Sequence, residues 1–273
     1  MAKYDIQSLL QKLSEIGVRP NKKLGQNFLI NKDVCERIVE RALKFNPSHI
    51  VEVGPGLGAL TEIIIEKNIP LTLIELDRSF VEHWQTRLAD NSTQKVFHAD
   101  ALQLDWSILN LPEKSLLLSN LPYQISSSLV IERSIYPMNI SAMVLMFQKE
   151  VGQRMVAKPK TDDYGMLTVI AQAFWKIENM MDVGSKDYYP PPQVASRVLA
   201  FVRKNADIPE PKKFLSFVKA AFSQRRKFLV SNLSSVKDKT LLLEKFAALQ
   251  ISDKARAEDL TVAQFIELYK SMV

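Results

Sequence analysis

The sequence predicts an α/β fold: an open, doubly wound parallel sheet followed by a small domain of helices alone. Three observations lead to this prediction. Short apolar segments alternate with segments of helical periodicity from His49 onward, a glycine-rich turn joins the first such pair, and the residues after position 211 carry only helical patterns. Strands that alternate with helices form βαβ units, in which successive strands run parallel.

The N-terminal segment precedes the sheet. Residues 4–16 carry apolar side chains at helical spacing and predict a helix. The next stretch, RPNKKLGQNFLINKD, has a proline, a glycine and four basic residues without a clear period, and we interpret it as an ordered arm or loop. Asp33 is expected to cap a helix that runs to about Lys44.

The expected strands of the central region are short apolar runs. They are HIVEV (49–53), LTLIELD (71–77), KVFHAD (95–100), SLLLSN (115–120) and SAMVLMF (141–147). Helical patterns follow the first, second and fourth runs, at 57–67, 79–88 and 125–135, and another covers 148–174 with an interrupting loop, KPKTDDYG. After the proline-rich turn YYPPPQV, the run SRVLAFV predicts a late strand that can pair antiparallel.

A polar segment with two prolines, NADIPEP, separates this region from the C-terminal helices. The expected domains are therefore residues 1–204, which include the basic N-terminal arm, and residues 205–273. Within the second domain, helical patterns cover residues 212–224, about 239–248 and 261–271.

The composition is that of an ordinary globular chain, with 47% hydrophobic and 24% charged residues. Cys35 is the single cysteine, which excludes an intrachain disulfide and fits a reducing, cytoplasmic environment. The longest apolar run, Ala142 to Phe147, is far too short to span a bilayer, so no membrane partner is expected.

Charge is distributed unevenly along the chain. Residues 1–32 carry six basic and two acidic side chains, residues 33–202 sixteen and twenty, and residues 203–273 fourteen and eight. The net charges of the three parts are thus +4, −4 and +6, which add up to the +6 of the whole chain. Two basic ends around an acidic middle indicate a polyanion such as nucleic acid held by the ends, although a solvated basic surface would show the same pattern.

Three consecutive strand ends carry groups suited to a nucleotide. GPGLG (54–58) joins the first strand to a helix, where glycines allow a ligand to approach the backbone and the helix start offers free amides. Glu75 ends the second strand, and its spacing in sequence from the glycine turn suits a residue that accepts hydrogen bonds from ribose hydroxyls. Asp100 ends the third strand, where it can accept a hydrogen bond from an adenine amine. A dinucleotide site remains open, since Ala59 in the place of the third fingerprint glycine is tolerated.

The segment Asn120-Leu121-Pro122-Tyr123 follows the fourth strand. The segment can be explained as a proline turn with an incidental tyrosine. It can also form a rigid polar pocket beside the nucleotide. An adenine amine is a poor nucleophile, and the Asn120 side-chain oxygen with a main-chain carbonyl can draw it toward a tetrahedral geometry. Alignment of this nitrogen with the group that it attacks would supply most of the rate acceleration. The base must leave its stack first, and Tyr123 can cover one face while Tyr188 covers the other.

Segments along nearly the whole chain resemble the KsgA family of small-subunit rRNA adenine N6-dimethyltransferases. The matching segments, in chain order, are LGQNFL (24–29), VEVGPGLGALT (51–61), IELD (74–77), NLPYQIS (120–126), FQKEVGQRM (147–155), YGMLTVIAQ (164–172), YYPPPQVASRV (188–198) and FSQRRKFLVSNL (222–233). The resemblance implies a Rossmann-like class I S-adenosylmethionine-dependent methyltransferase sheet with a small all-helical C-terminal domain.

The resemblance also implies roles for particular residues. The cofactor-binding residues are expected to be Asn27, Leu29, Gly54, Glu75, Asp100 and Asn120. The catalytic residues are expected to be Asn120, Leu121, Tyr123 and Tyr188. In these roles Asn120 and the Leu121 carbonyl contact the target amine and Tyr123 stacks on the base. The family usually has phenylalanine where this chain has Tyr188.

The expected cofactor is S-adenosylmethionine, which leaves as S-adenosylhomocysteine, with no metal, since His49, His83 and His98 lie on separate elements. The substrate implied by the resemblance is a pair of adjacent adenines in the 3′-terminal hairpin of 16S rRNA, within the immature 30S subunit. Arg225, Arg226 and Lys227 would then contact RNA phosphates, and the chain would act as a cytoplasmic monomer.

Three alternatives differ in class or target. A macrolide-resistance methyltransferase of 23S rRNA shares the chemistry, but such relatives usually have NIPY where this chain has NLPY, and FSQRRKFLVSNL favours the small-subunit enzyme. A non-catalytic RNA-binding assembly factor would not need Glu75, Asp100 and NLPY intact. An NAD-dependent oxidoreductase would need a proton donor that the sequence does not place, and the basic ends would have no role.

Overall fold

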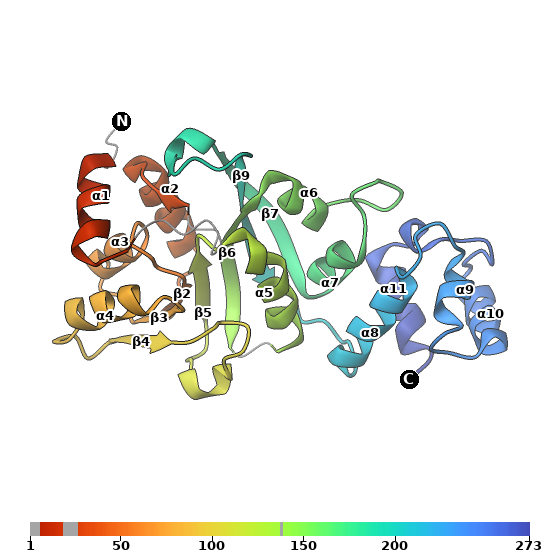
Figure 1. Cartoon of the computed structure of the whole chain (residues 1–273). Helices are drawn as coiled ribbons and strands as arrows, with labels where there is room; N and C mark the ends of the chain where they lie inside the picture. Colours follow the sequence, from red (N-terminus) through yellow and green to blue (C-terminus); the bar gives the residue numbers. More distant parts are fainter. Residues whose placement is uncertain (1–5, 19–26, 137–138) are drawn as a thin grey trace. The chain divides into compact units, whose positions relative to one another are not determined.

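The computed structural model describes residues 6–18, 27–136 and 139–273, so most of the basic arm, including Leu24, lies outside the described residues (Figure 1). Contact density divides the chain into two compact units. The first holds residues 1–133, 137–152 and 178–202, and the second holds residues 134–136, 153–177 and 203–273.

Within the described residues, seven strands form the sheet of the first unit in the order β4-β3-β2-β5-β6-β9-β7 (Figure 1). The strands are β2 (His49–Val53), β3 (Leu71–Glu75), β4 (Gln94–His98), β5 (Ser115–Ser119), β6 (Ile140–Gln148), β7 (Trp175–Val183) and β9 (Ser196–Arg203). Pairing is parallel from β4 through β6 and antiparallel between β6 and β9. The six predicted strands are confirmed, with ends that differ by a few residues.

Strand β7 was not predicted. Its sequence, WKIENMMDV, mixes apolar, charged and amide side chains, so it shows neither a continuous apolar run nor strict alternation. Only Trp175 and Val183, at its two ends, are fully buried. A strand at the edge of a sheet buries little, and its sequence therefore carries a weak signal.

Strand order places the functional edge. The chain begins the sheet at β2 and builds outward on one side through β3 and β4, then returns to the other side of β2 with β5. The carboxyl ends of β2 and β5 therefore flank the point where the order reverses, which is where ligands bind in open parallel sheets. Interior strands β3 and β5 are buried along their whole length, which suits central parallel strands covered on both faces.

Helices of the first unit connect these strands. They are α1 (Ile6–Glu15), α2 (Lys32–Leu43), α3 (Thr61–Glu66), α4 (Arg78–Arg87), α5 (Tyr123–Ile135) and α6 (Lys149–Met155), with short 3₁₀ turns η2 (Trp106–Leu109) and η3 (Ser185–Asp187). The predicted helices are confirmed, but the cap of α2 is Asn31 rather than Asp33. Asn31 has extended backbone angles and its Oδ1 accepts from the Val34 N–H at 3.3 Å, whereas Asp33 lies within the first turn.

The second unit is helical. It holds α7 (Met166–Phe174), α8 (Pro211–Ala221), α9 (Leu229–Leu233), α10 (Lys239–Ala248) and α11 (Val262–Lys270), with the 3₁₀ turn η4 (Ala257–Asp259). Aromatic side chains form its core: Phe214 packs edge-on against Phe174 and Tyr269, with ring centroids 6.2 and 5.3 Å apart. The predicted C-terminal helices correspond to α8, α10 and α11, and the short α9 was not predicted.

The contact-based units and the expected domains divide the chain at different places. The boundary expected at residues 204/205 assigns α7 to the sheet domain, whereas α7 packs against α8 and α11 and is grouped with the C-terminal helices. The domain division at 204/205 therefore stays a prediction. Among the residues that the structure describes, no helix combines the length and apolar character that a membrane crossing requires.

Candidate active site

A cavity of about 190 Å³ opens at the carboxyl edge of β2, β3 and β5, and all of its lining residues belong to the first unit. The structure brings most of the sequence-predicted site residues to its wall. They are Asn27, Leu29, Gly54, Glu75, Asp100, Asn120, Leu121 and Tyr123. Tyr188 is not among the lining residues. The arm and four successive strand ends thus meet at one place, as the sequence predicts.

The glycine turn after β2 has left-handed backbone angles, with φ of +67° at Gly54 and +86° at Gly58. A Cβ at Gly58 would lie 2.4 Å from the ring of Trp84, so this position needs glycine for packing as well as conformation. A Cβ at Gly54 would extend toward Pro122, at 3.6 Å, across the edge of the cavity. Helix α3 consequently starts at Thr61 rather than at Leu57.

Glu75 is 7% exposed at the end of β3, and its carboxylate is held by main-chain donors. Its Oε1 accepts from the N–H groups of Leu76 and Asp77 at 2.8 and 2.9 Å, and its Oε2 accepts from Gly56 at 3.3 Å. Burial raises the pKa of this carboxyl, and the three main-chain hydrogen bonds act in the opposite direction. The acceptor is therefore rigidly aimed at the cavity and linked to the glycine turn.

Glu52 is a second buried carboxyl in the cavity wall, and the sequence reasoning did not select it. It is 2% exposed, its Oε2 accepts from the Thr61 hydroxyl at 2.7 Å, and burial raises its pKa to about 8. The signal was present, since an acidic side chain in the middle of the apolar run HIVEV needs a partner or a ligand.

Asp100 lies two residues after β4 and is half-buried at the cavity wall. Its Oδ1 accepts from the Leu102 N–H at 2.9 Å, which orients the carboxylate at the start of a turn. The backbone just before it continues the sheet, because the Ala99 N–H donates to the Glu75 carbonyl at 2.9 Å. Glu75 and Asp100 are thereby fixed on adjacent strand ends.

The described part of the N-terminal arm closes one side of the cavity. Strand β1 (Phe28–Leu29) pairs antiparallel with β8 (Tyr188–Tyr189), and the Ile30 N–H donates to the Asp187 carbonyl at 2.8 Å. The Asn31 side chain donates to the Asp187 carboxylate at 2.7 Å. The described part of the arm is therefore bound to the segment that precedes the prolines, although the two are far apart in the sequence.

Asn120 follows β5 and connects the arm to the reacting corner. Its Nδ2 donates to the carbonyl of Asn27 at 3.1 Å. An amide whose NH₂ group is bound in this way presents its oxygen as an acceptor elsewhere. Pro122 turns the chain immediately afterward, and α5 begins at Tyr123.

The two tyrosines expected to enclose the target base lie in different environments. Tyr123 is half-buried and lines the cavity, as expected of a stacking ring. Tyr188 is 2% exposed and belongs to the hydrophobic core of the first unit, where its hydroxyl donates to the sulfur of Met146 at 3.6 Å. The expectation that Tyr188 covers a face of the base therefore does not match its position. The pairing of β8 with β1 holds it beneath the arm.

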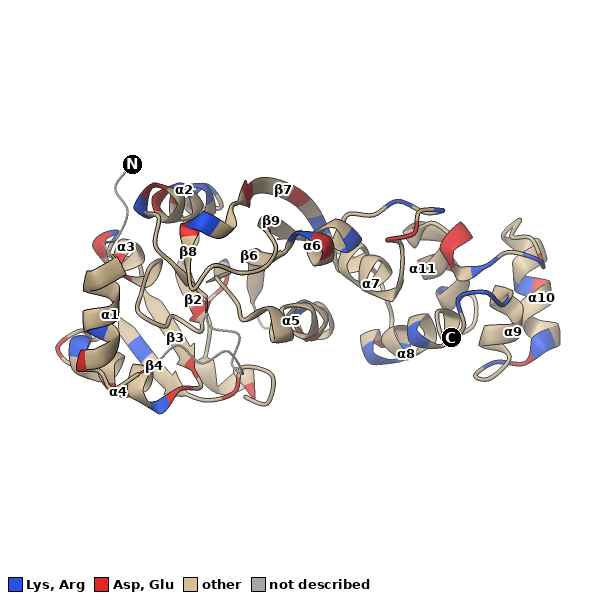
Figure 2. Ribbon diagram, turned by 45° about the horizontal axis from the view of Figure 1, so that its top comes forward, with Lys and Arg blue, Asp and Glu red and all other residues tan. Residues whose placement is uncertain are grey.

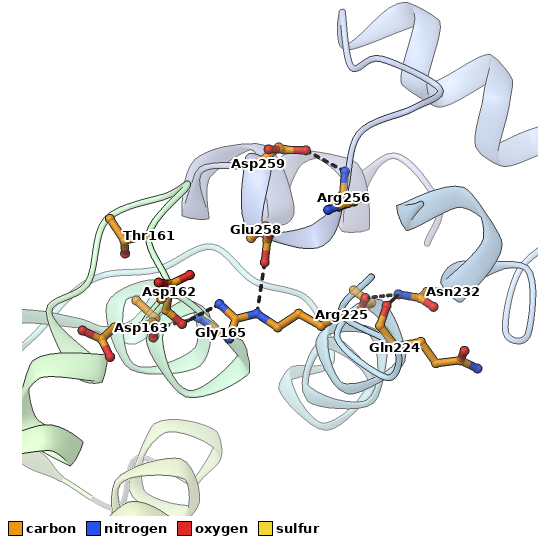
Figure 3. A network of polar contacts seen from close by, with 12 residues as sticks. Thr161, Asp162, Asp163, Gly165, Gln224, Arg225, Asn232, Arg256, Glu258 and Asp259 are labelled. Atoms are coloured by element: carbon orange, nitrogen blue, oxygen red, sulfur yellow. Dashed lines mark hydrogen bonds and ion pairs between the residues drawn. The ribbon is translucent and has the colours of Figure 1, made fainter. Parts of the chain in front are cut away.

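The basic residues of the second unit are of two kinds. Arg225 bonds within its own unit: its Nε donates to Glu258 Oε2 at 3.0 Å and its guanidinium to the Asp162 carbonyl (Figure 3). Arg226 and Lys227 are exposed on the turn between α8 and α9. Other basic residues lie on α8 and α10 (Figure 2). Arg225 thus stabilises the 158–165 loop, whereas its two neighbours face solvent.

The wall of the cavity fits S-adenosylmethionine. The glycine turn leaves room for a ligand beside the main chain, and Asp100 and Glu75 offer acceptors for an adenosine. No cluster of His, Cys, Asp and Glu able to hold a metal ion occurs among the described residues.

Comparisons with known proteins place the chain in a family. Residues 17–273 match the ribosomal RNA adenine dimethylase family. The chain is 46% identical over 272 residues to Ribosomal RNA small subunit methyltransferase A of Bdellovibrio bacteriovorus, covering 98% of this chain and 97% of that protein.

Two solved structures have the same fold. A dimethyladenosine transferase from Plasmodium falciparum superposes with a TM-score of 0.74 and 23% identity, over 88% of this chain and 95% of that one. The 23S rRNA methyltransferase ErmE superposes with a TM-score of 0.63 and 20% identity, over 90% and 99%. Both likenesses support the Rossmann-like class I methyltransferase fold.

Proposed function

The chain belongs to the ribosomal RNA adenine dimethylase family, and from this premise we propose that it dimethylates two adjacent adenines in the 3′-terminal hairpin of 16S rRNA. It is an rRNA (adenine-N6,N6)-dimethyltransferase that uses S-adenosylmethionine. The relative from Bdellovibrio bacteriovorus is named for the small ribosomal subunit, which favours this target over 23S rRNA.

One observation carries the proposal: acceptors from the ends of β3, β4 and β5 and the arm residue Asn27 meet at a single cavity. We propose that Glu75 binds the ribose, that Asp100 binds the adenine, and that Gly54 allows close approach of the methionine part; all three residues line the cavity. When bound, the cofactor supplies a methyl group activated by its sulfonium. A non-catalytic assembly factor would have no need for these carboxyls in a buried wall.

The chain's own residues would prepare the acceptor. The Asn120 Oδ1 and the Leu121 carbonyl accept hydrogen bonds from the two hydrogens of the adenine amine, which makes the nitrogen lone pair available. The bond from Asn120 Nδ2 to Asn27 fixes which atom of the amide faces the substrate. Tyr123 stacks on the flipped base. Positioning supplies most of the acceleration, and the proton leaves after the methyl group has transferred.

We propose that the acceptor is the immature 30S subunit, since the target hairpin must be accessible for its bases to leave the stack. The exposed Arg226 and Lys227 would contact phosphates of this particle. We also propose a cytoplasmic enzyme that acts as a monomer. The monomer is supported by the cavity wall, whose described residues all come from one unit of one chain.

A methyl-transfer assay tests the proposal. Purified protein is incubated with labelled S-adenosylmethionine and with immature 30S particles, mature 30S subunits or 23S rRNA, and primer extension maps the modified bases. We expect label only on the immature particle, at two neighbouring adenines. Label on 23S rRNA would support the macrolide-resistance alternative, and absence of label from every substrate would support an assembly factor.

A further inference from the structure

Three side-chain hydroxyl groups gather at the phenol end of Tyr123. The Tyr123 hydroxyl lies 2.6 Å from the Oγ of Ser196, a residue with 0% exposure at the start of β9. Tyr188 lies beside them, and its hydroxyl is the one that reaches Met146 on β6. The members of this cluster come from α5, β9, β8 and β6, so four elements of the first unit meet at one ring.

The backbone end of Tyr123 is held as well. Pro122 restricts the turn before it, and the Ser126 Oγ donates to the Tyr123 carbonyl at 2.9 Å. The ring is therefore fixed at both ends while its middle lines the cavity. A side chain held in its bound orientation before the ligand arrives loses less conformational entropy on binding.

We propose that Ser196 is a positioning residue for methyl transfer, which holds the phenol of Tyr123 so that the ring presents its face to the target adenine. In this arrangement Tyr188 supports the same anchor from beneath instead of contacting the base. The inference rests on the proposed function, because it takes Tyr123 to be the residue that stacks on the adenine.

The protonation states suit such an anchor. Burial raises the pKa of both the Tyr123 and the Tyr188 phenols, and hydrogen bonds to Ser196 only partly oppose this effect. Both phenols therefore keep their protons at neutral pH and can donate. No titratable group needs to change charge for the anchor to form.

The hydroxyl at position 188 has a consequence particular to this chain. A phenylalanine there would fill the same volume but would leave Ser196 and Tyr123 as a pair. Because Tyr188 is buried, its hydroxyl needs partners, and the Met146 sulfur and the serine–tyrosine pair provide them. The tyrosine that departs from the expected phenylalanine is thereby accommodated within the cluster.

A double-mutant cycle tests the proposal on the full chain. Single-turnover methyl transfer to immature 30S particles is measured at saturating S-adenosylmethionine for wild type, Ser196→Ala, Tyr123→Phe and the double variant. We expect each single variant to lower the rate about 5- to 10-fold, as the loss of one hydrogen bond implies. The double variant should be no slower than the slower single variant, because both changes remove the same bond. Tyr188→Phe should lower the rate about 2-fold and add nothing to Ser196→Ala.

Calorimetry with S-adenosylmethionine supplies a readout independent of catalysis, and its affinity should be unchanged in all variants. Ser115→Ala is the matched control. Ser115 is also 0% exposed, and its Oγ donates to the Pro112 carbonyl at 2.7 Å. It begins β5, at the end of this strand that lies away from the cavity. This control should transfer methyl groups at the wild-type rate.

The outcomes separate the inference from the function on which it rests. A wild-type protein that methylates no particle would refute the proposed function itself. With an active wild type, full activity of Ser196→Ala, or losses that multiply in the double variant, would overturn the positioning role. Should Ser196→Ala fail to fold, Tyr123→Phe and Tyr188→Phe still decide the matter, because wild-type rates in both would exclude the anchor.

Discussion

The cavity wall of the first unit and the basic turn of the second differ in how their charged side chains are held. In the wall, Glu52 and Glu75 are 2% and 7% exposed, and every carboxylate named there is held by main-chain or hydroxyl donors. On the turn at 224–228, Arg226 and Lys227 project into solvent. The contribution of a buried acceptor to binding depends on its exact position. The contribution of exposed charges to binding is shared among several side chains and decreases as the ionic strength rises.

From this difference we can predict which single substitutions have large effects on activity or binding. A buried, oriented group has no substitute from water when it is removed, so its loss is felt in full. An exposed cation near a polyanion is one contributor among several, and salt weakens all of them together. The following predictions test the contrast, from the largest expected effect to the smallest.

Asn120→Ala should lower the rate of methyl transfer about 100- to 1000-fold, because it removes an oriented acceptor at the reacting nitrogen. Binding of immature 30S particles should stay largely intact, as a filter-binding assay would measure. Asn91→Ala, an exposed turn asparagine, is the control. Near-normal turnover of Asn120→Ala would contradict the role of the Asn120 side chain as an acceptor for the adenine amine.

Glu75→Ala should weaken S-adenosylmethionine binding about 30- to 100-fold, since hydrogen bonds from the two ribose hydroxyls to a charged acceptor are lost. Isothermal calorimetry measures the affinity. Glu66→Ala removes an exposed carboxylate from the nearby helix α3 and should change nothing. An unchanged affinity in Glu75→Ala would place the ribose elsewhere.

Glu52→Gln should stabilise the protein at alkaline pH. Burial raises the Glu52 pKa from 4.5 to about 8, so in that window the folded protein holds a proton that the unfolded chain has released. This contribution to stability is fully present below about pH 4.5 and is lost as the pH rises through 8. Glutamine cannot ionise, so we expect a gain on the order of 5 kcal/mol at pH 9, from about 1.4 kcal/mol per pKa unit, that vanishes near pH 4. Thermal unfolding at both pH values measures it, and an equal effect at both would contradict the buried proton.

Removing Arg226 and Lys227 together should weaken particle binding about tenfold at physiological salt and reduce the slope of log K against log salt by about 1 to 2. The rate at saturating particle should not change. Lys67→Ala with Lys95→Ala removes the same charge from exposed positions of the first unit and serves as the control. A loss of turnover without a loss of affinity would give these cations a role inside the active site.

Arg225→Ala should reduce the free energy of unfolding by about 1 kcal/mol, since it breaks the bonds to Glu258 and to the Asp162 carbonyl that Figure 3 shows. Chemical denaturation of this variant beside Arg226→Ala measures the difference, and only the first should be destabilised. Equal stability of the two variants would mean that all three basic residues belong to the exposed surface.

Local patterns were sufficient for most of the fold and of the cavity. Apolar runs followed by helical periodicity predicted the parallel strands, and the ends of those strands carried Gly54, Glu75, Asp100 and Asn120 to one edge, because parallel strands share a carboxyl edge. Strand β7 escaped prediction since an edge strand is only partly buried, and Glu52 was overlooked within an apolar run although a buried acid there signals a site.

The sequence by itself determined the sheet and the positions of Glu75, Asp100 and Asn120 at its carboxyl edge, because these depend on strand order and on residues close together in the chain. Only the tertiary structure decided where Tyr188 and Arg225 lie and what they contact. Each is expected at a ligand from its motif, yet one is buried beneath the arm at 2% exposure and the other bonds to a loop sixty-three residues away. Burial and long-range pairing arise when distant segments pack, and no local pattern records them.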